Sequence, residues 1–414
     1  MIDQALLDHC LDKSVFTPWV TGDPAMDLEI ILNDECNKQC KYCYNVKYGK
    51  QYFPVGTKDP EEIKKNVKML MDWCKAYGYQ PKIDLFSAEV FSQEIGWSVL
   101  EIIADNAWPG LRIVVPSNME FIIDPEKRNR LLEIKKKINV HLSASVDGIY
   151  MEDNRPPARD EAFYEVLFGC QKEFGYGFHP MVYSDGIEKW KDNFLWFIKR
   201  MDEYQISHDK LYLLEVRNAE WSENEAREFG KFCNFLVKWI YDYSPETFID
   251  RIGDPHKNFN IPTLTMGRTD RGMPCSVQSI FAVRAGDLTV FPCHRLMYKG
   301  MALHKLSTDG QRITGVENIN FPLYLASKFA NRMNFPYCAS CINKYFCSGG
   351  CYGSQLETTG DMFTPIPTVC RLMFIKTAEI LLAFQELGVW NKIKERLTEE
   401  KIFAAKEILW KIKN

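Results

Sequence analysis

The sequence contains no run of about eighteen apolar residues, which a membrane-spanning helix would need. It has no excess of positive charge either, because the formal net charge is −4, and this removes the usual basis for binding nucleic acid or an anionic membrane. The amino terminus carries Asp3, Asp8 and Asp12 in place of a basic segment followed by an apolar one, so a secretory signal is not expected. These absences predict a cytoplasmic protein that binds neither nucleic acid nor membrane.

Cysteine, in contrast, is abundant, with fourteen copies among 414 residues. In a chain without an export signal, so many thiols indicate metal ligands rather than disulfides. Four of them, Cys10, Cys74, Cys170 and Cys233, lie in helix-like or apolar contexts that are typical of buried structural thiols. The other ten fall into two groups.

The first group is Cys36, Cys40 and Cys43, with an aromatic residue, Tyr42, directly before the third cysteine. It follows a short apolar run, 28–32, which predicts a buried strand that leads into a thiol-rich loop. Three thiolates can hold an iron–sulfur cluster and leave one iron open. Zinc is the alternative, although zinc sites usually pair short Cys-x-x-Cys knuckles.

Strand-like and helix-like segments alternate from Leu28 to about Val216. The predicted strands are 28–32, 82–86, 111–115, 138–145, 178–183 and 210–216. Each is followed by a segment with helical spacing of its apolar residues, and six such units in succession predict parallel strands with outer helices. With right-handed crossovers they would form an α/β fold, a barrel or partial barrel.

Cys-x-x-x-Cys-x-aromatic-Cys after a first strand resembles the signature of radical S-adenosylmethionine (radical SAM) enzymes. The resemblance implies an open (β/α)6 partial barrel and a [4Fe–4S] cluster on Cys36, Cys40 and Cys43. It also implies S-adenosylmethionine (AdoMet) as cofactor, bound to the open iron and cleaved to a 5′-deoxyadenosyl radical.

Active sites of parallel β/α folds lie at the carboxyl ends of the strands, and several polar residues follow the predicted strands there. By the resemblance, Glu89 would accept from the AdoMet ammonium group and Asn118 would bind a ribose hydroxyl. Ser145 would bind the AdoMet carboxylate, with Arg155 or Arg159 as its charged partner. Tyr42 is a further candidate for binding the cofactor. Glu215 and Arg217, at the end of the sixth strand, are either catalytic residues or a buried ion pair.

The second group of cysteines begins beyond a change of composition near Asp254. It consists of Cys275, Cys293, Cys338, Cys341, Cys347, Cys351 and Cys370. Core packing does not explain this spacing, and zinc remains the alternative to iron. The arrangement resembles the SPASM domain of radical SAM enzymes that modify peptides and proteins, which holds two auxiliary [4Fe–4S] clusters.

That resemblance implies that one auxiliary cluster, the outer one, is bound by Cys338, Cys341, Cys347 and Cys370. Three cysteines remain for the inner cluster: Cys275, Cys293 and Cys351. The inner cluster would then have an open iron that binds substrate, unless one of the four isolated cysteines completes it.

The expected organisation has four parts. These are a lead-in at 1–25, the partial barrel at 26–253, the SPASM domain at 254–375 and a helical tail at 376–414. No winged-helix leader-binding domain is expected before the first strand, so a separate protein would bind a peptide leader, or the barrel and SPASM surfaces would. The resemblance also implies a flavodoxin- or ferredoxin-type electron donor.

Among SPASM enzymes, sulfatase maturases place their proposed base, an Asp, directly after the second SPASM cysteine. His294 stands there, which counts against formylglycine formation although a His can also accept a proton. An open inner cluster would suit thioether formation, so crosslinking of a ribosomally made peptide is the first hypothesis. Epimerisation, formylglycine formation and small-molecule oxidation are the alternative reactions. The alternative to an enzyme is a non-catalytic protein that uses its clusters for electron transfer.

Overall fold

The structure is a computed structural model of the chain. The residues that it describes are 27–32, 35–45, 59–76, 78, 81–86, 88–217, 221–260, 277, 280–329, 335–347 and 349–413. The predicted lead-in at 1–25, with Cys10, and the predicted ligand Cys275 lie outside them.

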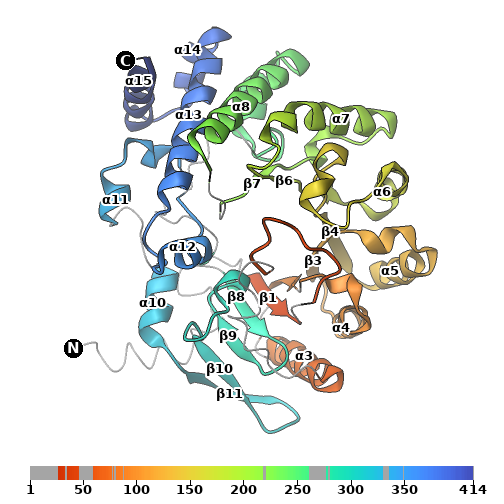
Figure 1. The fold of residues 1–414 in the computed structure, drawn as a ribbon. Helices are drawn as coiled ribbons and strands as arrows, with labels where there is room; N and C mark the ends of the chain where they lie inside the picture. The colour runs from red at the N-terminus through yellow and green to blue at the C-terminus, as the bar shows by residue number, and fades with distance from the viewer. Residues whose placement is uncertain are drawn as a thin grey trace.

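A wall of parallel strands with helices on its outer side forms the first part of the fold, and every strand except β5 is followed by a helix (Figure 1). The strands are β1 (Asp27–Ile31), β2 (Lys82–Phe86), β3 (Arg112–Ser117), β4 (Asn139–Ala144), β5 (Gly177–Phe178), β6 (Met181–Val182) and β7 (Leu214–Glu215). The helices are α3 (Pro60–Ala76), α4 (Glu94–Asp105), α5 (Pro125–Lys137), α6 (Glu161–Phe174), α7 (Trp190–Glu203) and α8 (Glu223–Tyr243). The mixed α/β fold with a large parallel sheet is therefore confirmed.

The predicted fifth strand is divided in two. β5 pairs with β4, whereas β6 pairs with β7 in a second, two-stranded sheet. Pro180 lies between them, and since it has no N–H to donate, it interrupts the ladder on one side. Its carbonyl still accepts from Leu214 N at 3.0 Å, so the wall continues towards β7. The predicted sixth strand is likewise shorter, because it is preceded by a 3₁₀ turn, η7 (His208–Lys210).

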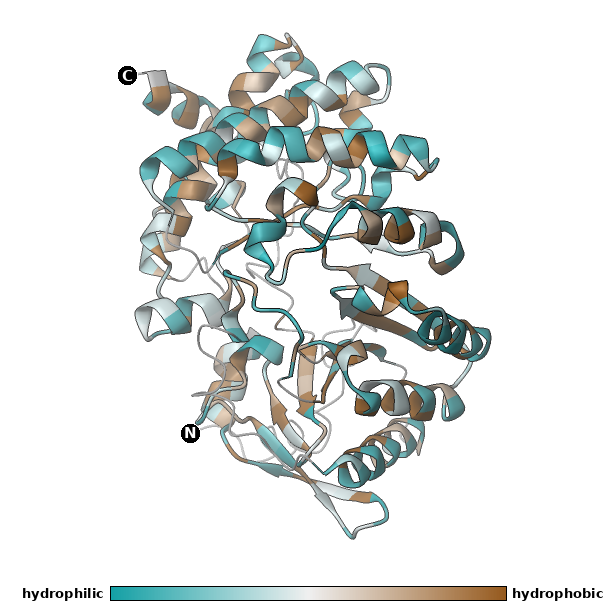
Figure 2. Ribbon diagram, turned by 45° about the vertical axis from the view of Figure 1, so that its right-hand side comes forward, coloured by the Kyte–Doolittle hydropathy of each residue, from teal (hydrophilic) through white to brown (hydrophobic). Residues whose placement is uncertain are grey.

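The two faces of β1 differ in character. Leu28 and Ile30 are fully buried against the hydrophobic core beneath the outer helices. Glu29 alternates with them and therefore lies on the inner face of the wall, directly beside Asp84 of β2 in the parallel register. Figure 2 shows the outer helices with hydrophobic inner faces and hydrophilic outer faces, as such packing requires.

Asp84 is buried on that inner face and forms an ion pair with Lys82 at 3.2 Å. Burial raises the pKa of Asp84 to about 6 from its usual 3.8, even though Lys82 acts in the opposite direction. The folded protein therefore holds a proton that the unfolded chain has already released, and stability falls as the pH rises towards 6. Between pH 5 and pH 7, we expect the free energy of unfolding of the wild type to fall by about 1 kcal/mol more than that of Asp84→Asn. Urea unfolding of both proteins at these two pH values measures this difference. An equal change of the free energy of unfolding in the two proteins would contradict the prediction.

The C-terminal part joins the same sheet on the other side of β1. β8 (Ile280–Arg284) pairs in parallel with β1, and β9 (Thr289–Phe291), β10 (His304–Thr308) and β11 (Ile313–Asn318) continue as an antiparallel extension. The remaining helices are α9 (Phe248–Gly253), α10 (Phe321–Phe329), α11 (Pro336–Ala339), α12 (Tyr352–Thr359), α13 (Pro367–Glu386), α14 (Trp390–Lys394) and α15 (Glu399–Lys413). The four domain limits stay predictions, although α13 continues through the expected boundary at 375.

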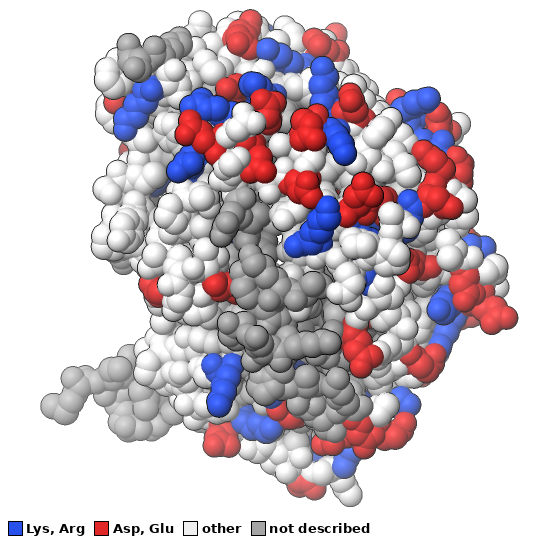
Figure 3. All heavy atoms as spheres, in the orientation of Figure 1, with Lys and Arg blue, Asp and Glu red and all other residues white. Residues whose placement is uncertain are grey.

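Helix α13 packs closely along α8. A Cβ atom at Gly230 would lie 2.7 Å from Ile375 Cγ2, so glycine is needed at this crossing. Within the described residues, no helix has both the length and the apolar character needed to cross a membrane. On the face drawn in Figure 3, acidic and basic side chains are interspersed along the upper and right-hand edges.

Candidate active site

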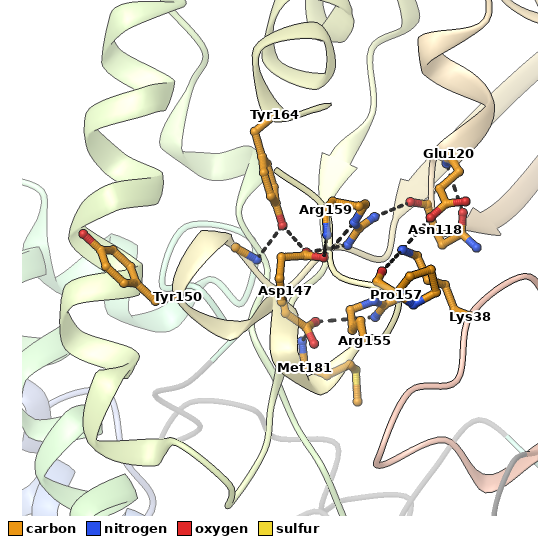
Figure 4. Close-up of polar contacts among 12 residues, drawn as sticks. Lys38, Asn118, Glu120, Asp147, Tyr150, Arg155, Pro157, Arg159, Tyr164 and Met181 are labelled. Carbon is orange, nitrogen blue, oxygen red and sulfur yellow. Dashed lines mark hydrogen bonds and ion pairs between the residues drawn. The ribbon is translucent and has the colours of Figure 1, made fainter. Parts of the chain in front are cut away.

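The loop of the first three cysteines follows β1 and is fastened to the segment after β4. Gln39 N donates to Pro156 O at 2.8 Å, and Lys41 N donates to Asn154 O at 2.9 Å. Between them, the buried Lys38 ammonium binds the Pro157 carbonyl and pairs with Glu120 (Figure 4). A charge in that position anchors the middle of the loop, so the cysteines on either side of Lys38 are held in place.

The three thiols lie close enough to influence one another electrostatically. Burial raises the pKa of Cys36 to about 11 and also raises that of Cys40, and the neighbouring thiols act in the same direction. Among the described residues, no three His, Cys, Asp or Glu side chains converge at the spacing of a single metal ion. Three cysteine thiols on one loop are the donor set that a [4Fe–4S] cluster takes, with each thiolate on a different iron.

A buried network of Tyr42, Asp147 and Arg155 lies beside this loop. The Tyr42 hydroxyl donates to Asp147 Oδ2 at 2.6 Å and accepts from Arg155 Nη1 at 2.6 Å. The other oxygen of Asp147, Oδ1, accepts from Met181 N at 2.9 Å and lies 3.5 Å from Arg155 Nη1 (Figure 4). Arg155 lowers the pKa of Cys40, against the raising effect of burial, so its guanidinium is close to the thiol loop.

Arg159 has a different environment. Its guanidinium makes two hydrogen bonds to Glu152, at 2.9 and 2.6 Å, and a third to Asn118 O at 2.7 Å (Figure 4). Tyr164 also hydrogen bonds to Glu152, and the Arg159 guanidinium lies over the Phe163 ring. Arg159 therefore pairs closely with Glu152. Arg155 approaches Asp147 only at 3.5 Å, and its buried Nε has no acceptor among the described residues.

The strand-end residues Glu89, Asn118 and Ser145 are brought together. Glu89 is buried and accepts from Ser117 Oγ at 2.9 Å and from Asn118 N at 2.6 Å. The Asn118 amide donates to Asn37 of the cysteine loop at 2.7 Å, and Ser145 N donates to Ser117 O at 2.7 Å. The predicted cofactor residues thus surround one side of the loop, and their individual roles stay predictions.

His294 lies at the same end of the wall. Glu29 accepts from its backbone N–H at 2.6 Å and contacts its Nδ1 at 2.8 Å, and the ring stacks on Phe86 with centroids 4.3 Å apart. Tyr44, directly after the first cysteine group, lies between the His294 ring and the Arg295 guanidinium. Burial raises the pKa of Tyr44, and the thiols of Cys43 and Cys293 act in the same direction. Tyr44 therefore connects the two cysteine groups.

Four thiols of the second group also lie near one another. Burial raises the pKa of Cys370 to about 12, and Cys347, Cys338 and Cys341 raise it further, so these four thiols are neighbours. They are the four that the resemblance to the SPASM domain assigns to the outer cluster. Cys293 and Cys351 lie towards the first cysteine loop, since each interacts with a group beside that loop, Tyr44 and Arg295 respectively.

The buried Glu215 carboxylate forms an ion pair with the partly exposed Arg217 at the end of β7, at 2.6 Å. Arg217 interacts with the thiols of Cys347 and Cys351. The predicted catalytic pair is thus placed against the second cysteine group, and its part in catalysis stays a prediction. Cys74 and Cys233 are fully buried in helices, as expected for structural thiols.

The buried Lys328 connects the segments that carry two predicted ligands of the inner cluster. Its Nζ donates to Val277 O at 2.6 Å, to Pro292 O at 3.2 Å and to Ile280 O. We expect Lys328→Met to lower the free energy of unfolding by about 2–4 kcal/mol, because three buried carbonyls lose a charged donor. Urea unfolding measures this, with the exposed Lys299→Met as control. Equal stability of the two variants would contradict it.

The sequence pattern did not point to Glu29 or Asp147 as site residues. Glu29 is the one acidic residue within the first apolar run, and an isolated charge on a buried strand was the available signal. Asp147 precedes Gly148 and is equally typical of a turn, so only its contacts with Tyr42 and Arg155 distinguish it.

No protein-family model matches the sequence, and no curated protein matches it. Solved structures do. The structure of native anSMEcpe with bound AdoMet aligns with a TM-score of 0.57 and 14% identity over 89% of this chain and 99% of that chain. Streptococcus suis SuiB bound to S-adenosylmethionine aligns with a TM-score of 0.50 and 12% identity over 84% of this chain and 75% of that chain. Both neighbours are radical SAM SPASM enzymes.

This chain has the radical SAM fold. The likeness extends over both the strand–helix wall and much of the C-terminal part, since it covers 89% of the chain. At 14% identity it establishes the radical SAM fold alone, so the chemistry must be argued from this chain's own residues.

Proposed function

We propose that this protein is a radical SAM enzyme that binds AdoMet and modifies a ribosomally made peptide. The observation that carries the proposal is the three-cysteine loop, fastened beside Tyr42, Asp147 and Arg155 at the strand ends of a radical SAM fold. A [4Fe–4S] cluster on Cys36, Cys40 and Cys43 would supply the electron that cleaves AdoMet to methionine and a 5′-deoxyadenosyl radical.

The residues around the loop would bind and orient AdoMet. Arg155 is the better partner for the AdoMet carboxylate, because its buried Nε has no acceptor within the described residues whereas Arg159 is engaged with Glu152. Tyr42 and Asp147 fix the other side of the Arg155 guanidinium. Glu89 already accepts from Ser117 and from two backbone N–H groups, and one remaining lone pair could receive the AdoMet ammonium group.

The second cysteine group would hold two auxiliary [4Fe–4S] clusters in a SPASM domain. The clustering of Cys338, Cys341, Cys347 and Cys370 supports the outer one. Cys293 and Cys351, with Cys275 as third ligand, would hold the inner one. An open iron there could bind a substrate thiolate, which favours a crosslink such as a thioether as the modification.

His294 would accept the proton that leaves the substrate during the modification. Glu29 binds its Nδ1, so with that nitrogen protonated the other nitrogen, Nε2, is left as the acceptor. The same arrangement would serve formylglycine formation, which is the second candidate because Glu29 gives His294 the orientation of a base. A separate leader-binding protein and a flavodoxin- or ferredoxin-type electron donor remain the proposed partners.

The test is anaerobic reconstitution followed by iron and sulfide analysis and by measurement of 5′-deoxyadenosine after reduction with AdoMet present. About twelve irons per chain, with 5′-deoxyadenosine formed, are expected from three [4Fe–4S] clusters. Three clusters without cleavage of AdoMet would indicate an electron-transfer protein instead. Bound zinc in the C-terminal part, with about four irons, would remove the auxiliary clusters from the proposal.

A further inference from the structure

The Glu215 carboxylate, at the end of β7, joins the parallel wall to the C-terminal part. Its Oε1 accepts from Arg217 Nη2 at 2.6 Å and from Nε at 3.0 Å. Its Oε2 accepts at 3.3 Å from Lys376, which is fully buried on α13, the helix that also carries Cys370. Burial alone would raise the pKa of Glu215, but Lys376 and Arg217 lower it to about 2, so the carboxylate stays ionised.

Arg217 extends this contact to the second cysteine group. Its Nη1 donates to Gly349 O at 3.2 Å, and Gly349 N donates to Cys347 Sγ at 3.2 Å. Gly349 has φ of +82°, a conformation that other residues rarely adopt, so this double contact depends on glycine. The contacts therefore run without a break from a strand end of the wall to the sulfur of a predicted cluster ligand.

The guanidinium also lies near a ligand of each predicted auxiliary cluster. Burial lowers the pKa of Arg217, while Glu215 and the thiols of Cys347 and Cys351 raise it. A cation near a cluster sulfur favours negative charge there. Cys347 is assigned to the outer cluster and Cys351 to the inner one, which places a single cation beside both.

We propose that Arg217, held by Glu215, is a positioning residue that sets the reduction potentials of the auxiliary clusters. The inference rests on the proposed function, because it requires clusters on Cys347 and Cys351. Hydrogen bonds to the sulfurs and nearby charge are among the main determinants of the potential of an iron–sulfur cluster. A reduced cluster carries one more negative charge, so both the cation and the N–H donor favour reduction.

The experiment is a potentiometric titration, followed by electron paramagnetic resonance, of the reconstituted full-length protein and its variants. In Arg217→Gln we expect at least one auxiliary cluster to titrate at a more negative potential than in the wild type. In Arg217→Lys, which keeps the charge but lacks the guanidinium fork, we expect the potential to return part of the way. The matched control is Arg227→Gln on the exposed face of α8, which should leave every potential unchanged.

Iron analysis of each protein separates the outcomes. Unchanged auxiliary potentials in an Arg217→Gln protein with its full iron content would overturn the inference and leave the proposed function standing. If Arg217→Gln loses iron, the fully loaded Arg217→Lys protein decides: an auxiliary potential more negative than in the wild type supports the inference, and wild-type potentials there would overturn the role of the guanidinium contacts. A wild type that holds no auxiliary iron would refute the proposed clusters, and the inference with them, before any potential is measured.

Discussion

Replacing Cys40 with alanine is expected to abolish the formation of 5′-deoxyadenosine. Cys40 is the buried member of the first cysteine group, and its thiol lies near Arg155 and Asp147. Two remaining thiolates would leave a second iron of the cluster without a protein ligand, and AdoMet could not be held beside Arg155. Chromatographic assay of 5′-deoxyadenosine under reducing, anaerobic conditions measures the effect, and the loss should exceed a hundredfold.

Cys170→Ala is the matched control for this experiment. Cys170 is a half-buried thiol on α6 that packs against the hydrophobic core and belongs to neither cysteine group. The control should keep both the iron content and the yield of 5′-deoxyadenosine. An undiminished yield from Cys40→Ala would show that the first cysteine group is not the site of AdoMet cleavage.

The parallel wall was predictable because its signals are local. Apolar runs of strand length alternate with helical spacing, and the helix starting at Pro60 has both the proline and the acidic first turn that its sequence indicates. The pairing of β8 with β1 was not predicted. It joins residues about 250 positions apart, and no local pattern of 280–284 specifies which strand it meets.

The candidate site also has features that the sequence predicts and features that it does not. The thiols are recognisable from spacing alone, since ligand chemistry requires several cysteines near one another. The choice between Arg155 and Arg159 was left open, because both follow the same turn and their partners depend on tertiary packing. From their place at a strand end, Glu215 and Arg217 are predicted either as catalytic residues or as a buried ion pair, and the structure shows the ion pair. Which residues they face depends on α13 and on the Cys347–Cys351 loop, which the strand pattern does not contain.

Exchanging each of these two arginines for lysine separates their roles. Arg155→Lys removes the guanidinium, and with it both the Nη1 that binds Tyr42 and the Nε that has no acceptor among the described residues. The affinity for AdoMet should therefore fall about tenfold, or about 1.4 kcal/mol. In Arg159→Lys, the bidentate bond to the buried Glu152 is lost, so the free energy of unfolding should fall by about 2–3 kcal/mol with the affinity for AdoMet nearly unchanged.

Equilibrium dialysis with labelled AdoMet and urea unfolding of the reconstituted proteins measure the two quantities side by side. Each variant serves as the control for the other, because both keep a positive charge and the two buried arginines lie only four positions apart. The decisive quantity is the ratio of the two AdoMet affinities. If Arg159→Lys weakens AdoMet binding as much as Arg155→Lys does, the Glu152 pair must open when the cofactor binds. Arg159 would then be the carboxylate partner, and the engaged guanidinium would be the state before binding.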